Sequence, residues 1–166
     1  SVVPCARPGC GHRCDRRSGG DGSGEGCRSK VSDSRLVCDA SALVTVLLDS
    51  GNAGDWLARR LPSPDLAAPA LLPFECSNVI RRHEVGGLIS SDQAAQAHND
   101  LVDLPIDLFP YEPLAQRVWQ LRRNLTSYDA AYVALAEILD APLITVDRRL
   151  AGAAGIACRV ELAPNG

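Results

Sequence analysis

Four acidic residues lie where a carboxylate could take part in chemistry, after apolar runs or in the first turns of helical patterns: Asp39, Glu75, Asp129 and Asp147. Asp39 and Asp147 each follow a short apolar run that is typical of a buried strand. Asp129 and Glu75 fall in the first turns of predicted helices, and at Asp129 the helix dipole favours a negative charge. Taken singly, each acid is also explained as a helix cap, a solvated charge or, for Glu75, one half of an ion pair with Arg82.

Taken together, the four acids indicate a metal site. Carboxylates that are brought close together repel one another, and burial increases the repulsion. A fold would keep them together only if a cation neutralised them. Hard oxygen ligands select Mg²⁺, or alternatively Mn²⁺, over a soft metal. Such an ion polarises a phosphodiester and lowers the pKa of bound water, so the prediction is hydrolysis without a His or Cys nucleophile.

Three polar residues close to these acids are candidates for supporting roles. Ser41 and Thr145 each lie two residues from a predicted ligand, and Asn78 lies three residues after Glu75 on the same helical face. Each could orient a carboxylate or a water bound to the metal. Each is individually explained as well by an ordinary cap or a satisfied polar group.

Alternating strand and helix patterns must position these residues. Strands are predicted at 35–39, 65–69, 106–109, 143–146 and 158–162, with helices following Ser41 and at 52–61, 71–85, 91–102, 113–121 and 127–139. Ser41 is the predicted cap of the first helix, and the last helix is apolar almost all round, as buried helices are. Short links between alternating elements favour an α/β fold with a mostly parallel sheet. Ligands bind such sheets beyond the carboxyl ends of the strands.

The charge of the chain is divided unevenly along its length. Residues 1–30 carry six basic and three acidic residues, a net charge of +3, whereas residues 31–166 carry 11 Arg and 17 acidic residues, a net charge of −6. An acidic domain does not hold nucleic acid by bulk charge. Local phosphate contacts can still come from arginines close to the acids, and the candidates are Arg82, Arg148 and Arg149. Their alternative role is in ion pairs.

The first 34 residues differ in composition from the rest and are rich in Gly, Ser, Arg and Cys. We expect residues 1–34 to be a disordered tail and residues 35–162 to form one domain. Four tail cysteines and His12 fit no common zinc spacing, and an odd total of seven argues against a disulfide framework. The chain has neither a signal-peptide pattern nor an apolar run of about 18 residues, so we expect a cytoplasmic protein without a membrane span.

The ordered set of motifs resembles the PIN-domain family. The motifs are Leu-Val-Cys-Asp39-Ala-Ser41, Phe-Glu75-Cys-Ser-Asn78, Ser-Tyr-Asp129-Ala-Ala-Tyr-Val-Ala-Leu-Ala and Leu-Ile-Thr145-Val-Asp147. Within that family the match is closest to the VapC toxins of bacterial toxin–antitoxin pairs, and it covers residues 35–162. Any single motif is weak, but all four occur in the right order. The first 30 residues have no counterpart in the family pattern.

The resemblance implies a three-layer α/β/α domain and a Mg²⁺-dependent endoribonuclease that acts on structured RNA. By the same resemblance, the four acids form the metal site and are assisted by Ser41, Asn78 and Thr145. It also implies a homodimer and a cognate antitoxin that covers the active site.

Other function classes remain open on the sequence alone. A receiver domain would also place acids at strand ends, but it requires a Lys near its last strands, and the single Lys here is Lys30. A PIN-like domain without activity could serve only as a binding partner of an antitoxin. A nuclease that prefers DNA is a third alternative, since metal-assisted hydrolysis does not need the 2′-hydroxyl group.

Overall fold

The computed structural model describes residues 35–48, 51–61 and 65–164. The predictions made for residues 1–34, including the tail cysteines, lie outside these ranges. The described residues comprise five short strands and seven helices, and almost every element predicted from the sequence is found within one or two residues of its expected bounds.

The five strands form one parallel sheet in the order β3-β2-β1-β4-β5. Their bounds are Leu36–Cys38 for β1, Leu66–Pro69 for β2, Asp107–Phe109 for β3, Leu143–Thr145 for β4 and Val160–Leu162 for β5. The strands β1, β2 and β4 are fully buried, which explains why their sequences are apolar throughout, apart from Thr145, instead of alternating. The mostly parallel sheet expected from the sequence is confirmed.

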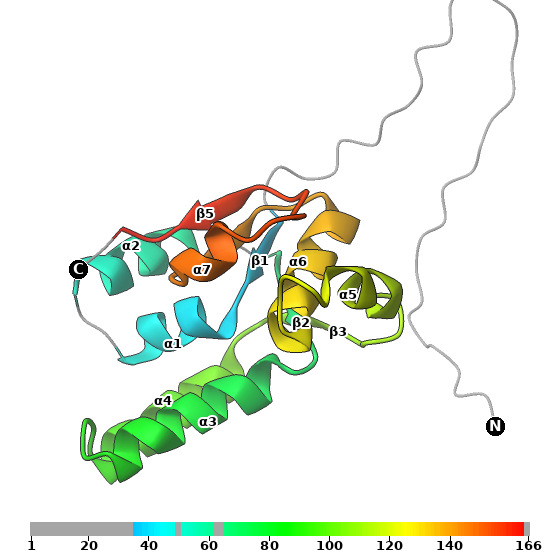
Figure 1. Cartoon of the computed structure of the whole chain (residues 1–166). Coiled ribbons are helices and arrows are strands. Elements are labelled where there is room, and N and C mark those ends of the chain that lie inside the picture. Colours follow the sequence, from blue (N-terminus) through cyan, green and yellow to red (C-terminus); the bar gives the residue numbers. More distant parts are fainter. Residues whose placement is uncertain (1–34, 49–50, 62–64, 165–166) are drawn as a thin grey trace, which may run out of the picture. The chain divides into compact units, whose positions relative to one another are not determined.

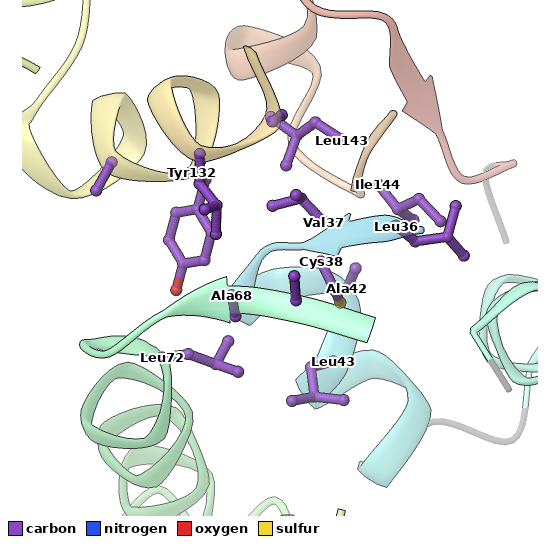
Figure 2. Packing of buried hydrophobic residues seen from close by; sticks show 14 of the residues in the cluster. Leu36, Val37, Cys38, Ala42, Leu43, Ala68, Leu72, Tyr132, Leu143 and Ile144 are labelled. Atoms are coloured by element: carbon purple, nitrogen blue, oxygen red, sulfur yellow. The ribbon is translucent and has the colours of Figure 1, made fainter. Parts of the chain in front are cut away.

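Helices cover both faces of this sheet, in the expected three-layer α/β/α arrangement (Figures 1 and 2). Helix α6 packs on β1, β2 and β4 and is itself covered by α5, whereas α1 packs against α2, α3 and α4. The bounds are Ala40–Leu48 for α1, Asn52–Arg60 for α2, Leu72–Val85 for α3, Ser91–Asp103 for α4, Ala115–Leu121 for α5, Ser127–Leu139 for α6 and Arg148–Ala151 for α7.

The cap of α1 differs from the sequence-based expectation. Helix α1 begins at Ala40, so Ser41 lies inside its first turn and cannot be its N-cap. Asp39 takes that place, and its Oδ1 accepts a hydrogen bond from the backbone N–H of Ala42 at 2.8 Å. The physical reason is that Asp39 lies directly before the first residue of the helix, so its carboxylate can reach the backbone N–H of the third helical residue. The cap of α4 is Ser90.

The core is built from aliphatic side chains and from the whole circumference of α6. Residues Ala130–Ala136 of that helix are all buried, which confirms the apolar pattern as that of a buried helix. Cys38 and Cys76 are buried, whereas Cys158 is only half-buried because it lies just before the edge strand β5. Within the described residues, no helix has both the length and the apolar character needed to cross a lipid bilayer.

Candidate active site

The two central strands of the sheet bring the first and last of the four acids together. Asp39 directly follows β1, and Asp147 lies two residues after β4, which pairs with β1. The chain order of the strands reverses between β1 and β4, and such a reversal opens a crevice at the carboxyl ends of a parallel sheet. Helix α3 begins directly after β2 and supplies Glu75, while α6 supplies Asp129 from its first turn.

All four acids line one pocket with a volume of about 450 Å³. Three further residues singled out from the sequence, Ser41, Asn78 and Arg82, line the same pocket. Arg149 lines a smaller neighbouring pocket that also contains Asp129 and Asp147. Thr145 is fully buried beneath the site, and Arg148 is exposed outside both pockets.

Asp39 is the most deeply placed of these acids, with only 6% of its surface exposed. Its Oδ2 accepts a hydrogen bond from the Thr145 hydroxyl at 2.5 Å, and Ser41 donates to both carboxylate oxygens at 2.8 and 3.0 Å. Burial nevertheless raises the pKa of Asp39, and the charge of Asp147 raises it further. Ser41 and Thr145 therefore orient the carboxylate of Asp39, but as neutral hydroxyl donors they do not neutralise its negative charge.

Glu75 is held by a partner that the sequence did not reveal. The hydroxyl of Tyr132 donates a hydrogen bond of 2.6 Å to Oε2 of Glu75, although the two residues are 57 positions apart. The Tyr132 ring passes from α6 into the core beside β2 (Figure 2) and is 3% exposed. Burial raises the pKa of Glu75, with further contributions from the charges of Asp129 and Asp39. The sequence did offer one signal for Tyr132: it lies three residues after Asp129, and residues three apart share a helix face, so Tyr132 could have been placed beside the acids.

The other two acids are held at helix N-termini. Thr126 caps α6, accepting from the Asp129 backbone N–H at 3.1 Å while its hydroxyl donates to Asp129 Oδ2 at 2.8 Å. Asp147 caps α7 by accepting from the Arg149 backbone N–H at 2.8 Å. The Arg149 guanidinium also lies 3.0 Å from Asp147 and lowers the pKa of that carboxyl. Arg149 therefore makes the ion pair that was the alternative to an RNA contact.

The oxygen donors of this pocket fit a hard divalent cation in their chemistry. The four carboxylates come from four separate elements, and the charges of neighbouring acids act on the buried Asp39 and the half-buried Glu75. Among the described residues, no three acidic, His or Cys side chains lie close enough together to hold a metal ion as they stand. The physical reason is that each carboxylate is turned toward a protein donor, so a cation would have to draw them inward.

Comparison with known proteins decides the family. The model of the PIN domain matches residues 36–156 of the chain. The chain belongs to the PIN-domain family. This PIN domain is 42% identical over 127 residues to Ribonuclease VapC1 of Mycobacterium tuberculosis, covering 76% of this chain and 96% of that protein. It is also 42% identical over 127 residues to Ribonuclease VapC12 of the same species, covering 76% of this chain and 98% of that protein. These relatives place the PIN domain among the VapC ribonucleases.

Solved structures agree with this fold. The structure of M. tuberculosis VapC20, described as a sarcin–ricin loop cleaving toxin, has a TM-score of 0.57 at 14% identity, covering 78% of this chain and 99% of that one. PAE2754 from Pyrobaculum aerophilum has a TM-score of 0.56 at 20% identity, covering 84% and 92% of the two chains. At these identities the likeness shows the fold of the PIN domain, and the family assignment rests on the sequence matches.

Proposed function

We propose that this chain is a divalent-metal-dependent endoribonuclease that acts as the toxin of a toxin–antitoxin pair and cleaves structured RNA. The observation that carries the proposal is the meeting of Asp39, Glu75, Asp129 and Asp147 in one pocket at the carboxyl ends of the central strands. Four carboxylates that face one cavity repel one another unless a cation is present. The names of the VapC relatives support the same activity.

In the proposed site, the four acids hold Mg²⁺ or Mn²⁺. When bound, the ion supplies the positive charge that polarises the scissile phosphodiester and makes a water molecule more acidic. The reaction would be hydrolysis: a water oxygen would bond to phosphorus as one of the two ester bonds breaks, and the proton released by the water would be balanced by the one taken up by the departing oxygen. The Ser41 and Thr145 hydroxyls orient the carboxylate of Asp39, and Tyr132 orients that of Glu75.

Two partners follow from the family and belong to this proposal. A cognate antitoxin would cover the pocket and suppress cleavage, and a second copy of the chain would form a homodimer. Asn78 and Arg82 line the pocket without a hydrogen bond to any of the four acids, so both are free to contact substrate. Arg148 is exposed nearby and could contact a phosphate, whereas Arg149 would first have to leave Asp147.

The first test is RNA cleavage by the purified chain with and without divalent metal, together with mapping of RNA ends in cells after induction. We expect cleavage that requires Mg²⁺ or Mn²⁺ and is lost in Asp129→Asn. Asp92→Asn is the matched control, because Asp92 also lies in the first turn of a helix but lines no part of the pocket. An inert wild-type protein that still binds its antitoxin would overturn the nuclease proposal in favour of a binding protein.

The second test measures the metal directly. A cation that binds the folded state raises thermal stability by mass action, so millimolar Mg²⁺ or Mn²⁺ should raise the melting temperature of the wild-type chain. Asp129→Asn should respond less and Asp92→Asn should respond fully. A melting temperature that stays constant across millimolar metal would contradict the proposed site, whatever the RNA assay shows.

A further inference from the structure

Two exposed aromatic rings stand at the rim of the pocket that contains the four acids. The Phe74 side chain is 74% exposed and that of Tyr128 is 62% exposed, and both line this pocket. The chain has two Phe, three Tyr and two Trp residues, so these are two of only seven aromatic residues. Leaving such rings in water gives up the large stabilisation that an aromatic side chain gains from burial.

The two rings occupy equivalent places relative to the acids. Phe74 directly precedes Glu75 in the first turn of α3, and Tyr128 directly precedes Asp129 in the first turn of α6. Consecutive helical residues point about 100° apart, so each ring stands beside the carboxylate that follows it instead of covering it. Both rings are exposed whereas the four acids are buried or half-buried, so one ring from each of two helices lies nearer the mouth of the pocket than the acids do.

The other described aromatic residues have identifiable partners more often than these two. The Arg122 guanidinium lies 4.7 Å from the Trp119 ring, that of Arg35 lies 5.9 Å from the Phe109 ring, and Tyr132 is bonded to Glu75. Among the described residues, no aromatic ring or cation stacks on Phe74 or Tyr128. Most of the surface of both side chains is therefore accessible to a ligand.

We propose that Phe74 and Tyr128 stack on the nucleobases that flank the scissile phosphate, so that the enzyme cuts RNA at unpaired nucleotides. This inference rests on the proposed nuclease function. A phosphate held at the acids would carry its two neighbouring nucleosides toward the rim, where the rings lie. Bases in an RNA duplex are already stacked on one another, whereas bases in loops and bulges are available to aromatic side chains.

The net charge of the domain also favours a role for aromatic stacking in RNA binding. Residues 31–166 carry a net charge of −6, from 11 Arg and 17 acidic residues, so the domain as a whole repels a polyanion. Stacking on an aromatic ring contributes to RNA binding without positive charge and with little dependence on base identity. The two rings thus provide a source of affinity that the bulk electrostatics of this domain does not.

The experiment separates binding from cleavage by using an Asp39→Asn background. The probe is a short RNA hairpin with 2-aminopurine in its loop, compared with the same base inside a full duplex. Phe74→Leu and Tyr128→Leu remove the aromatic face and keep an apolar side chain. Tyr111→Leu is the matched control, because Tyr111 is also exposed but lies outside the pocket.

We expect the wild-type rim to quench the loop probe and to bind the hairpin more tightly than the duplex. Each rim variant should bind the hairpin on the order of ten-fold more weakly and lose quenching, while Tyr111→Leu should change neither. In the active enzyme the same variants should raise KM for hairpin cleavage more than they lower kcat. Equal binding by all variants, or equal cleavage of duplex and loop, would overturn the inference.

Two further outcomes keep this inference distinct from the proposed function. Unchanged RNA binding, combined with weaker capture of the co-expressed antitoxin by the rim variants, would make the rim a protein-docking surface and would also overturn it. Failure of the nuclease proposal would show differently, as a wild-type chain that cleaves no RNA while the Asp39→Asn background still reports stacking on the loop probe.

Discussion

Two glutamates in this structure each accept hydrogen bonds from one long side chain of another helix. Their environments shift the pKa values of the two carboxyl groups in opposite directions. Glu75 in α3 accepts a hydrogen bond from the neutral hydroxyl of Tyr132 at 2.6 Å, and its pKa is raised, mainly by burial. Glu137 in α6 is bound by Arg117, with contacts of 2.6 and 3.0 Å to its two carboxylate oxygens, and this pairing lowers its pKa.

The comparison distinguishes a glutamate in a structural ion pair, Glu137, from a glutamate in the candidate ligand site, Glu75. The ion pair of Glu137 is complete, since Oε1 also accepts from the Ala157 backbone N–H at 2.8 Å and Arg117 donates to the Gly155 carbonyl at 2.6 Å. Glu75 has a donor that fixes its direction but makes no ion pair within the described residues. In the proposed metal site, the bound cation would neutralise the negative charge of Glu75.

The largest expected difference between the two glutamates is in RNA cleavage. Glu75→Gln removes one carboxylate from the proposed metal site, so we expect cleavage to fall by about 100-fold or more. Glu137→Gln makes the same chemical change away from the pocket and should leave the rate per folded molecule unchanged. The measurement is the initial rate on one RNA at saturating Mg²⁺, and equal rates for the two variants would remove Glu75 from the site.

A smaller effect is expected from the donor that orients Glu75. Tyr132→Phe removes only the hydroxyl, and loss of such an orienting contact weakens metal binding by about ten-fold or more. Tyr128→Phe is the matched control, because it removes a hydroxyl from the same helix that makes no hydrogen bond to Glu75. Mn²⁺ titration followed by electron paramagnetic resonance measures both affinities. Identical Mn²⁺ affinities would show that Tyr132 serves only the packing of the core.

In the absence of metal, the same Glu→Gln change should affect stability with opposite signs at the two positions. Glu137→Gln loses charged hydrogen bonds to Arg117, whose side chain is 29% exposed while that of Glu137 is 15% exposed, and we expect a loss of about 1–2 kcal/mol. Glu75→Gln removes a partly desolvated negative charge that lies close to other acids, and it should raise the melting temperature in EDTA. The measurement is chemical or thermal unfolding at neutral pH.

The contribution of Glu137 should also depend on pH with a definite sign. Because its folded-state pKa is lowered, the stability it contributes is present above its unfolded pKa of about 4.3 and is lost as the pH falls through the lower folded value. The stability difference between the wild-type chain and Glu137→Gln should therefore shrink below about pH 4. A difference that stays constant from pH 7 to pH 3 would show that the ion pair does not carry the effect.

The smallest expected effect concerns two adjacent arginines of α3. Arg82 lines the acidic pocket and Arg81 lines a different one on the α4 side of α3. If Arg82 contacts a phosphate, Arg82→Ala should weaken RNA binding and reduce the slope of log affinity against log salt by about 0.7–0.9. Arg81→Ala should leave the slope unchanged. The same slope for both variants would reject a phosphate contact at Arg82 alone.

Most of the fold and the membership of the pocket could be predicted from the sequence, because both depend on local patterns. Apolar runs marked the buried strands, and acids directly after two of them marked the carboxyl end of the sheet. The pairing of Tyr132 with Glu75 could not be predicted, because it depends on how α6 lies over the beginning of α3. The ion pair of Glu137 with Arg117 was missed for a similar reason, since the two residues lie on different helices.

By itself, the sequence determined which residues are candidates for the chemistry and on which elements they lie, because periodicity and chain order set the strands, the helices and their sequence. Only the tertiary structure decided the state of each carboxylate. Asp39 is the cap of α1, Asp147 forms an ion pair with Arg149, and the half-buried Glu75 accepts a hydrogen bond from a neutral hydroxyl. Those outcomes depend on desolvation and on neighbours brought from distant parts of the chain, and neither is written in the local order of residues.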